Sequence, residues 1–186
     1  MTVQEDKSQK SIENTDKERQ EWKTNWLFVI IASIQFLSMV GQIILIGFFF
    51  ENHNIKSLPI IGCVIISIAF VFLASGSIVL YERVENKEKR RPRIRFEEKG
   101  IYTIIRHPMY LGLMILFIGM MFISDLRWSS ILAFPSIIIM YYYMIKEESI
   151  FIERFGEDFK EYMDRVPRMD IFLGIYRKIK KQYKKE

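Results

Sequence analysis

Long apolar runs alternate with charged stretches along most of the chain. Trp26 to Phe50 contains only uncharged polar interruptions, and Leu58 to Tyr81 is similar in length and character. Each run exceeds the roughly 20 residues that cross a bilayer as a helix. Pro108 to Ser124 is a shorter third run, and Trp128 to Ile145 is a fourth. The pattern predicts an all-α, polytopic membrane protein with about four transmembrane helices.

The charged stretches divide the chain into four parts. Residues 1–25 mix both charge signs without an apolar period, which is typical of a flexible tail. Residues 26–81 are predicted to form a transmembrane hairpin, and residues 82–107 a basic loop. Residues 108–186 are predicted to form a second hairpin followed by short helices that cap it on the cytoplasmic side. Small residues in the second run are expected to let helices pack closely, among them Gly62, Ala69 and Gly76.

Basic residues lie almost entirely on alternate sides of the apolar runs. The N-terminal tail, the basic loop and the region after residue 145 contain 25 of the 27 lysines and arginines. Positive residues concentrate on the cytoplasmic side of membrane proteins. We therefore expect a multi-pass protein with both termini in the cytoplasm. A cleaved signal peptide is not expected, because the first apolar run follows a charged tail and is longer than a signal core.

The basic loop is expected to contact anionic lipid headgroups, because it lies beside a membrane span. Nucleic acid is not an expected partner. A metal site is not expected either, since His53 has no histidine, cysteine or acidic cluster near it to complete one. The single cysteine excludes an intrachain disulfide. The sequence does not indicate an oligomeric state.

Polar residues gather where the third run begins and the fourth run ends. The segment RHPMYLG, from Arg106 to Gly112, enters the third run. Glu147 and Glu148 leave the fourth run on the same side. Pro108 suits the first turn of a helix, so the following N–H groups favour an anion, to which Arg106 adds a bidentate contact. Each residue alone is compatible with a structural role, but their combination at membrane-segment ends indicates a site.

These motifs resemble those of the isoprenylcysteine carboxyl methyltransferases and the related phospholipid methyltransferases, which are integral membrane enzymes that use S-adenosylmethionine. The resemblance covers GIYTIIRHPMYLG from Gly100, the two glutamates, and FGEDFKEYMDRVPR from Phe155 to Arg168. The resemblance implies a set of cofactor-binding residues: Tyr102, Arg106, His107, Tyr110, Gly112, Glu147, Glu148 and Tyr162. It also implies a set of catalytic residues: Arg106, Glu148 and Arg165.

The resemblance further implies methyl transfer from S-adenosylmethionine to a hydrophobic or lipid-linked acceptor. Displacement at a sulfonium has a good leaving group, so positioning and desolvation are expected to supply most of the acceleration. A carboxylate acceptor needs no base. An amine acceptor must lose a proton, and Glu147 and Glu148 are the candidates to accept it. The acceptor itself, and the choice between O- and N-methylation, stay open.

Two other functions fit the sequence. A sterol-type membrane reductase has a similar C-terminal region and would place a nicotinamide phosphate near the arginines. A non-catalytic membrane adaptor would use the basic loop to recruit anionic lipid. A soluble Rossmann-type methyltransferase scaffold is excluded, because no glycine-rich turn joins a strand to a helix.

Overall fold

The computed structural model describes residues 26, 29–48, 57–85, 100–124 and 126–183. The described residues form helices and short connections, with no strand among them. A helix over Val29–Phe48 is followed by α2 (Ser57–Glu85), η3 (Gly100–Thr103), α3 (Pro108–Ile123), α4 (Leu126–Phe155), α5 (Glu157–Arg165) and α6 (Ile171–Tyr183). The expected N-terminal tail, His53 and most of the basic loop lie outside the described residues.

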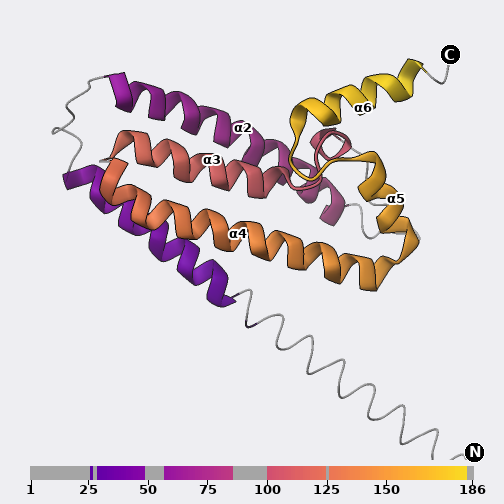
Figure 1. Ribbon diagram of the computed structural model, residues 1–186, viewed down its shortest axis with the longest axis horizontal. Helices are drawn as coiled ribbons and strands as arrows, with labels where there is room; N and C mark the ends of the chain where they lie inside the picture. Colours follow the sequence, from indigo (N-terminus) through magenta and orange to yellow (C-terminus); the bar gives the residue numbers. More distant parts are fainter. Residues whose placement is uncertain (1–25, 27–28, 49–56, 86–99, 125, 184–186) are drawn as a thin grey trace, which may run out of the picture. The chain divides into compact units, whose positions relative to one another are not determined.

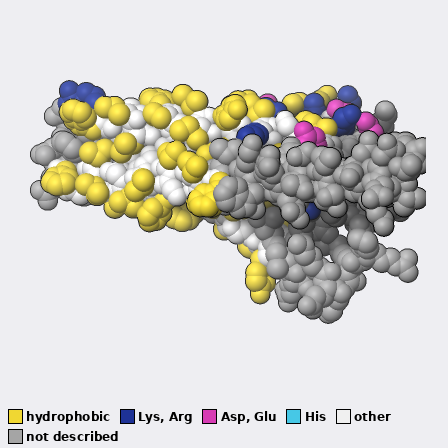
Figure 2. Space-filling model, turned by 90° about the horizontal axis from the view of Figure 1, so that it is seen from below, with side chains coloured by type: hydrophobic (Ala, Val, Ile, Leu, Met, Phe, Trp, Pro, Cys, Tyr) yellow, Lys and Arg dark blue, Asp and Glu magenta, His cyan; other side chains and the backbone are white. Residues whose placement is uncertain are grey.

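The apolar helices agree with the predicted membrane class. Among the described residues, three helices are long and apolar enough to cross a membrane: Val29–Phe48, Ser57–Val79 and Arg127–Phe155. On the face shown in Figure 2, hydrophobic side chains cover most of the described helical surface, and charged side chains gather towards the ends. Helix α3 is apolar but has 16 residues, about 24 Å, which is less than a typical hydrocarbon core of about 30 Å. The fourth span therefore stays a prediction.

The chain divides into two compact units, the first ending at Val40 and the second beginning at Gly41. The polar residues singled out by the sequence all belong to the second unit. Within it, α2, α3 and α4 lie alongside one another, and α5 and α6 lie at the end where α3 begins and α4 finishes (Figure 1). This arrangement brings the RHPMYLG segment and the two glutamates to the same end of the helices.

Small residues set the distance between α2 and α3. A Cβ on Gly119 would lie 3.1 Å from the carbonyl oxygen of Gly62, and a Cβ on Gly112 would lie 3.1 Å from that of Ala69. Gly62 and Ala69 are seven residues apart on α2, as Gly112 and Gly119 are on α3. Close approach of backbones at small residues is a common mode of helix packing in membranes. The expected role of Gly62 and Ala69 in packing is confirmed.

Helix α5 turns back onto the end of α4. Gly156 joins the two helices with a φ of 57°, a conformation that favours glycine. Phe159 and Tyr162 of α5 are buried together with Val166, and they pack against aromatic side chains at the end of α4, including Phe151. This small apolar cluster fixes the direction in which the chain leaves α5.

The segment after α5 folds against the segment before α3. The backbone N–H of Arg106 donates to the carbonyl of Pro167 at 3.0 Å, and that of His107 donates to the carbonyl of Arg168 at 3.2 Å. Helix α6 then packs closely on the same region, since a Cβ at Gly174 would overlap the carbonyl of residue 104. The expected C-terminal helices therefore cover this end of α3, while their position on the cytoplasmic side stays a prediction.

Candidate functional site

Glu148 is the centre of a buried charged cluster. The residue is 2% exposed, although it carries a carboxylate in the last part of α4. Its Oε1 lies 3.0 Å from Nη2 of Arg106 and 3.0 Å from Nε2 of His107. Its Oε2 accepts hydrogen bonds from Nη2 and Nε of Arg168 at 2.6 and 3.0 Å. A buried carboxylate requires such partners, because leaving it unpaired would cost several kcal/mol.

The start of α3 presents Arg106 and His107 to this carboxylate. Pro108 begins the helix, and the side chain of His107 makes no capping hydrogen bond to it. The imidazole instead turns towards Glu148, while the pairing with the segment at residues 167–168 holds the backbone in place. The structure thus brings together the two residues that the sequence placed at the helix start with one of the two glutamates at the end of α4.

Arg106 retains an unused donor. Its side chain is 7% exposed, and its buried Nε has no hydrogen-bond acceptor among the described residues. Burial lowers the pKa of the Arg106 guanidinium, and the nearby Glu148 opposes this effect. Two guanidinium groups, those of Arg106 and Arg168, face the one carboxylate of Glu148. The cluster therefore has both a positive charge and a directed N–H available for an anionic ligand group.

Glu147 lies in a different environment from Glu148. Its Oε2 is 3.9 Å from Nδ1 of His107, and its carboxyl group hydrogen-bonds the side chain of Tyr110. The rings of His107 and Tyr110 meet edge to face, with centroids 5.6 Å apart. The side chain of Glu147 is 31% exposed, and no arginine is among these contacts. Its carboxylate can therefore accept further hydrogen bonds, whereas both oxygens of Glu148 are already engaged.

Arg168 was not among the predicted site residues, yet it is the closest partner of Glu148. Hydrogen bonds from the Glu148 carboxylate raise the pKa of the Arg168 guanidinium. The guanidinium also donates to the hydroxyl of Tyr141 at 3.3 Å. The sequence signal that could have identified Arg168 is its place directly after Pro167, at the end of the motif carried by the resemblance.

The resemblance predicts that Arg165 is catalytic. In the structure its side chain is exposed and hydrogen-bonds within α5. Its Nε donates to the carbonyl of Glu161, one helical turn earlier, at 3.2 Å. The buried Tyr162 contributes indirectly, because its hydroxyl donates to the carbonyl of Tyr102 at 2.9 Å and so ties α5 to η3. The cofactor role of both tyrosines and the catalytic role of Arg165 stay predictions.

Gly112 is in contact with α2 in the described structure. A Cβ at this position would lie 2.9 Å from the side chain of Leu73, which shows that the glycine faces the neighbouring helix. Its predicted place beside a cofactor is therefore not evident from the packing and stays a prediction. Among the described residues, no three His, Cys, Asp or Glu side chains are grouped so that they could hold a metal ion.

The fold and the charged cluster define a helical membrane protein with a polar site at one end of its apolar helices. The model of the phospholipid methyltransferase family matches residues 57–158, more than half of the chain, and the chain belongs to this family. The family is related to the isoprenylcysteine carboxyl methyltransferases, so the resemblance seen in the sequence is confirmed. Neither a comparison with curated proteins nor one with solved structures found a match.

The family match makes this protein a membrane methyltransferase at the level of the family. The matched residues include Arg106, His107, Glu147 and Glu148, whereas Arg168 lies beyond them. The match favours the methyltransferase over the sterol-type reductase and the non-catalytic adaptor.

Proposed function

We propose that the protein transfers a methyl group from S-adenosylmethionine to a hydrophobic or lipid-linked acceptor, and that the cluster around Glu148 binds the cofactor. The observation that carries this proposal is the contact of Arg106 and His107 with Glu148, which joins the start of α3 and the end of α4 in one buried site. The family supports the reaction class.

The residues of the cluster suit the polar groups of the cofactor. S-adenosylmethionine carries a carboxylate, an amino group and ribose hydroxyls, and when bound it supplies a methyl group on a positively charged sulfur. The unpaired Nε of Arg106 and the N–H groups at the start of α3 suit the carboxylate. Glu147, with its remaining acceptor capacity, suits the amino group or a hydroxyl. The rings of His107 and Tyr110 offer a face to the adenine.

The two glutamates have different tasks in this proposal. Glu148 holds the arginines and the imidazole in position, because both of its oxygens are already engaged. Glu147 is the group that can accept a proton from an amine acceptor, such as the headgroup amine of a phospholipid. A carboxylate acceptor, as on an isoprenylated cysteine, would need no such base. The apolar outer surfaces of α3 and α4 would admit the hydrocarbon part of either acceptor from the bilayer.

The proposal is tested by incubating membranes that contain the protein with methyl-labelled S-adenosylmethionine. We expect label in a lipid or lipid-linked fraction, and we expect Glu148→Gln to abolish it. Glu153→Gln is the matched control, because Glu153 is an exposed acid on the same helix. Binding of a nicotinamide cofactor, without labelling of any lipid, peptide or small molecule, would overturn the proposal.

A further inference from the structure

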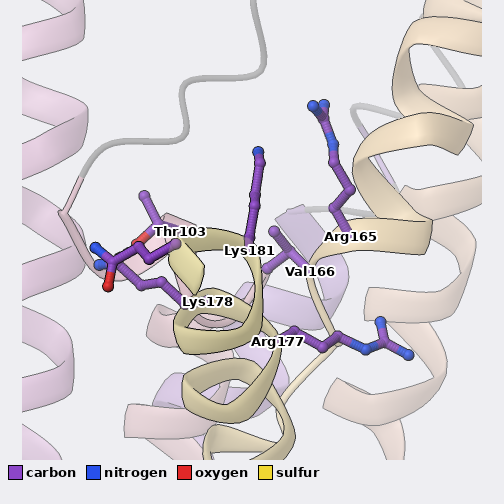
Figure 3. A pocket seen from close by; sticks show the side chains of 7 residues that line it. Thr103, Arg165, Val166, Arg177, Lys178 and Lys181 are labelled. Carbon is purple, nitrogen blue, oxygen red and sulfur yellow. The ribbon is translucent and has the colours of Figure 1, made fainter. Parts of the chain in front are cut away.

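A pocket lies between α6 and the ends of η3 and α5, and none of the residues that contact Glu148 lines it. The pocket has a volume of about 200 Å³. Its lining includes Thr103 of η3, Arg165 of α5 and three basic residues of α6: Arg177, Lys178 and Lys181. No carboxylate is among the described residues that line it. Figure 3 shows Arg165 and Lys181 extending to the same side of the pocket, with Lys178 next to Thr103.

Two of these cations are held in place by uncharged groups. Nη1 of Arg177 donates to the backbone carbonyl of Asp164 at 2.8 Å. Nζ of Lys178 donates to the hydroxyl of Thr103 at 2.9 Å. Hydrogen bonds of this kind fix the side chains but provide no negative charge. With Arg165 and Lys181, these residues place four cationic side chains around the pocket, and a bound anion would lower the repulsion among them.

The helical register of α6 argues against the basic residues being only a solvated surface. Arg177, Lys178 and Lys181 share the face of Gly174, which packs against the backbone before α3. The opposite face of α6 carries exposed apolar side chains: Phe172, Ile175, Tyr176, Ile179 and Tyr183. Arg177, Lys178 and Lys181 therefore lie on the face of α6 that lines the pocket, where Arg177 is half-buried and the two lysines are exposed.

We propose that this pocket binds an anion of the phosphate class, supplied by an anionic lipid headgroup or by free phosphate. Arginine and lysine side chains are the common ligands of phosphate groups in proteins, and the threonine hydroxyl adds a neutral hydrogen-bonding group. The pocket shares no residue with the cluster around Glu148, although Arg177 lies near enough to Arg106 to act on its charge. The bound anion would join α6 to α5 and to η3, the three segments that contribute the pocket.

Binding is measured on the full-length protein purified in a neutral detergent, with short-chain phosphatidylglycerol and inorganic phosphate as the two probes. We expect saturable binding in calorimetry and about tenfold weaker binding for Arg177→Gln and for Lys178→Gln. Lys180→Gln is the matched control, because it removes the same charge from the same helix outside the pocket. Lys178→Arg keeps the charge and is expected to keep most of the binding.

The two probes separate the possible sources of the anion. Displacement of the lipid by inorganic phosphate supports a site that recognises the phosphate group alone. Saturable lipid binding that phosphate does not displace supports a lipid headgroup as the ligand. An equal loss of binding in Lys180→Gln and in the two pocket variants would indicate an effect of general surface charge. That result would overturn the proposal. Failure of both probes to bind saturably would overturn it as well. Methyl transfer is not a readout, so this result is independent of the proposed reaction.

Discussion

Arg168 donates two hydrogen bonds to a single oxygen of Glu148, from Nη2 at 2.6 Å and from Nε at 3.0 Å. Because Arg106 and His107 occupy the other oxygen, the carboxylate is held between the segment before α3 and the segment after α5. The geometry of the candidate site therefore depends on a part of the chain that follows both apolar helices of the second hairpin.

Replacing Arg168 tests this dependence. We expect Arg168→Gln to lower methyl transfer about tenfold or more and to destabilise the protein by about 1–3 kcal/mol, because two hydrogen bonds between charged groups are lost. Arg165→Gln is the comparison, and its activity is expected to stay within about twofold of the unmodified protein, since the residue is exposed. Both effects are read from initial rates and from denaturation in detergent. The reverse order of the two variants would support the catalytic role that the resemblance assigned to Arg165.

Replacing Glu147 distinguishes the two classes of acceptor. We expect Glu147→Gln to lower the rate about 100-fold or more with an amine acceptor, because the group that accepts the proton is removed. With a carboxylate acceptor, which has no proton to lose, the loss is expected to be about tenfold, because only the contact of Glu147 with the cofactor is removed. The measurement is the initial rate with a phospholipid amine and with a prenylcysteine analogue. Equal losses with both acceptors would indicate that Glu147 acts through the cofactor alone and is not a base.

Arg106→Lys tests the assignment of the unpaired Nε to the carboxylate of the cofactor. Lysine preserves the positive charge, but its three N–H donors share one nitrogen, so it cannot donate from the separate positions of Nη2 and Nε of Arg106. We expect the KM for S-adenosylmethionine to rise about tenfold with a smaller change in kcat. Arg154→Lys, at an exposed position on α4, is the control. A fall in kcat at constant KM would place the role of Arg106 in the transition state.

The contact between α2 and α3 predicts a specific effect on stability. We expect Gly119→Val to lower the free energy of unfolding by about 1–3 kcal/mol, because its side chain would meet the backbone carbonyl of Gly62. Gly47→Ala is a suitable comparison, since a Cβ at Gly47 has no atom within 4 Å. That change is expected to be neutral or to stabilise the helix by up to about 1 kcal/mol. Thermal unfolding in detergent measures both; equal effects would contradict the proposed contact.

The sequence predicted most of the helices and placed Arg106 and Glu148 at the same end of the third and fourth apolar runs. Both follow from local rules, because hydrophobic runs set the helix ends and antiparallel helices bring the ends of consecutive runs together. The sequence also indicates the break between α4 and α5, because Gly156 lies there and glycine favours the positive φ that the chain adopts.

The role of Arg168 could not be predicted from residue spacing. Helical periodicity places Tyr162 and Arg165 on one face of α5, and the resemblance implied the catalytic role of Arg165. The structure instead uses the residues after the helix, where Pro167 and Arg168 pair with the backbone of Arg106 and His107. That pairing joins residues about 60 positions apart, so the motif that ends at Arg168 does not by itself show which residues it contacts. The contact of Gly112 with α2 likewise depends on the register of two helices.

The two backbone hydrogen bonds from Arg106 and His107 also impose an order on biosynthesis. The carbonyls that accept them belong to residues 167 and 168, which leave the ribosome long after α3 has been made and which follow the family-matched stretch ending at residue 158. A nascent chain that has inserted its apolar helices still lacks the groups that hold the arginine and the histidine in place. The charged cluster around Glu148 is thus completed late, once the tail has been synthesised and has folded back.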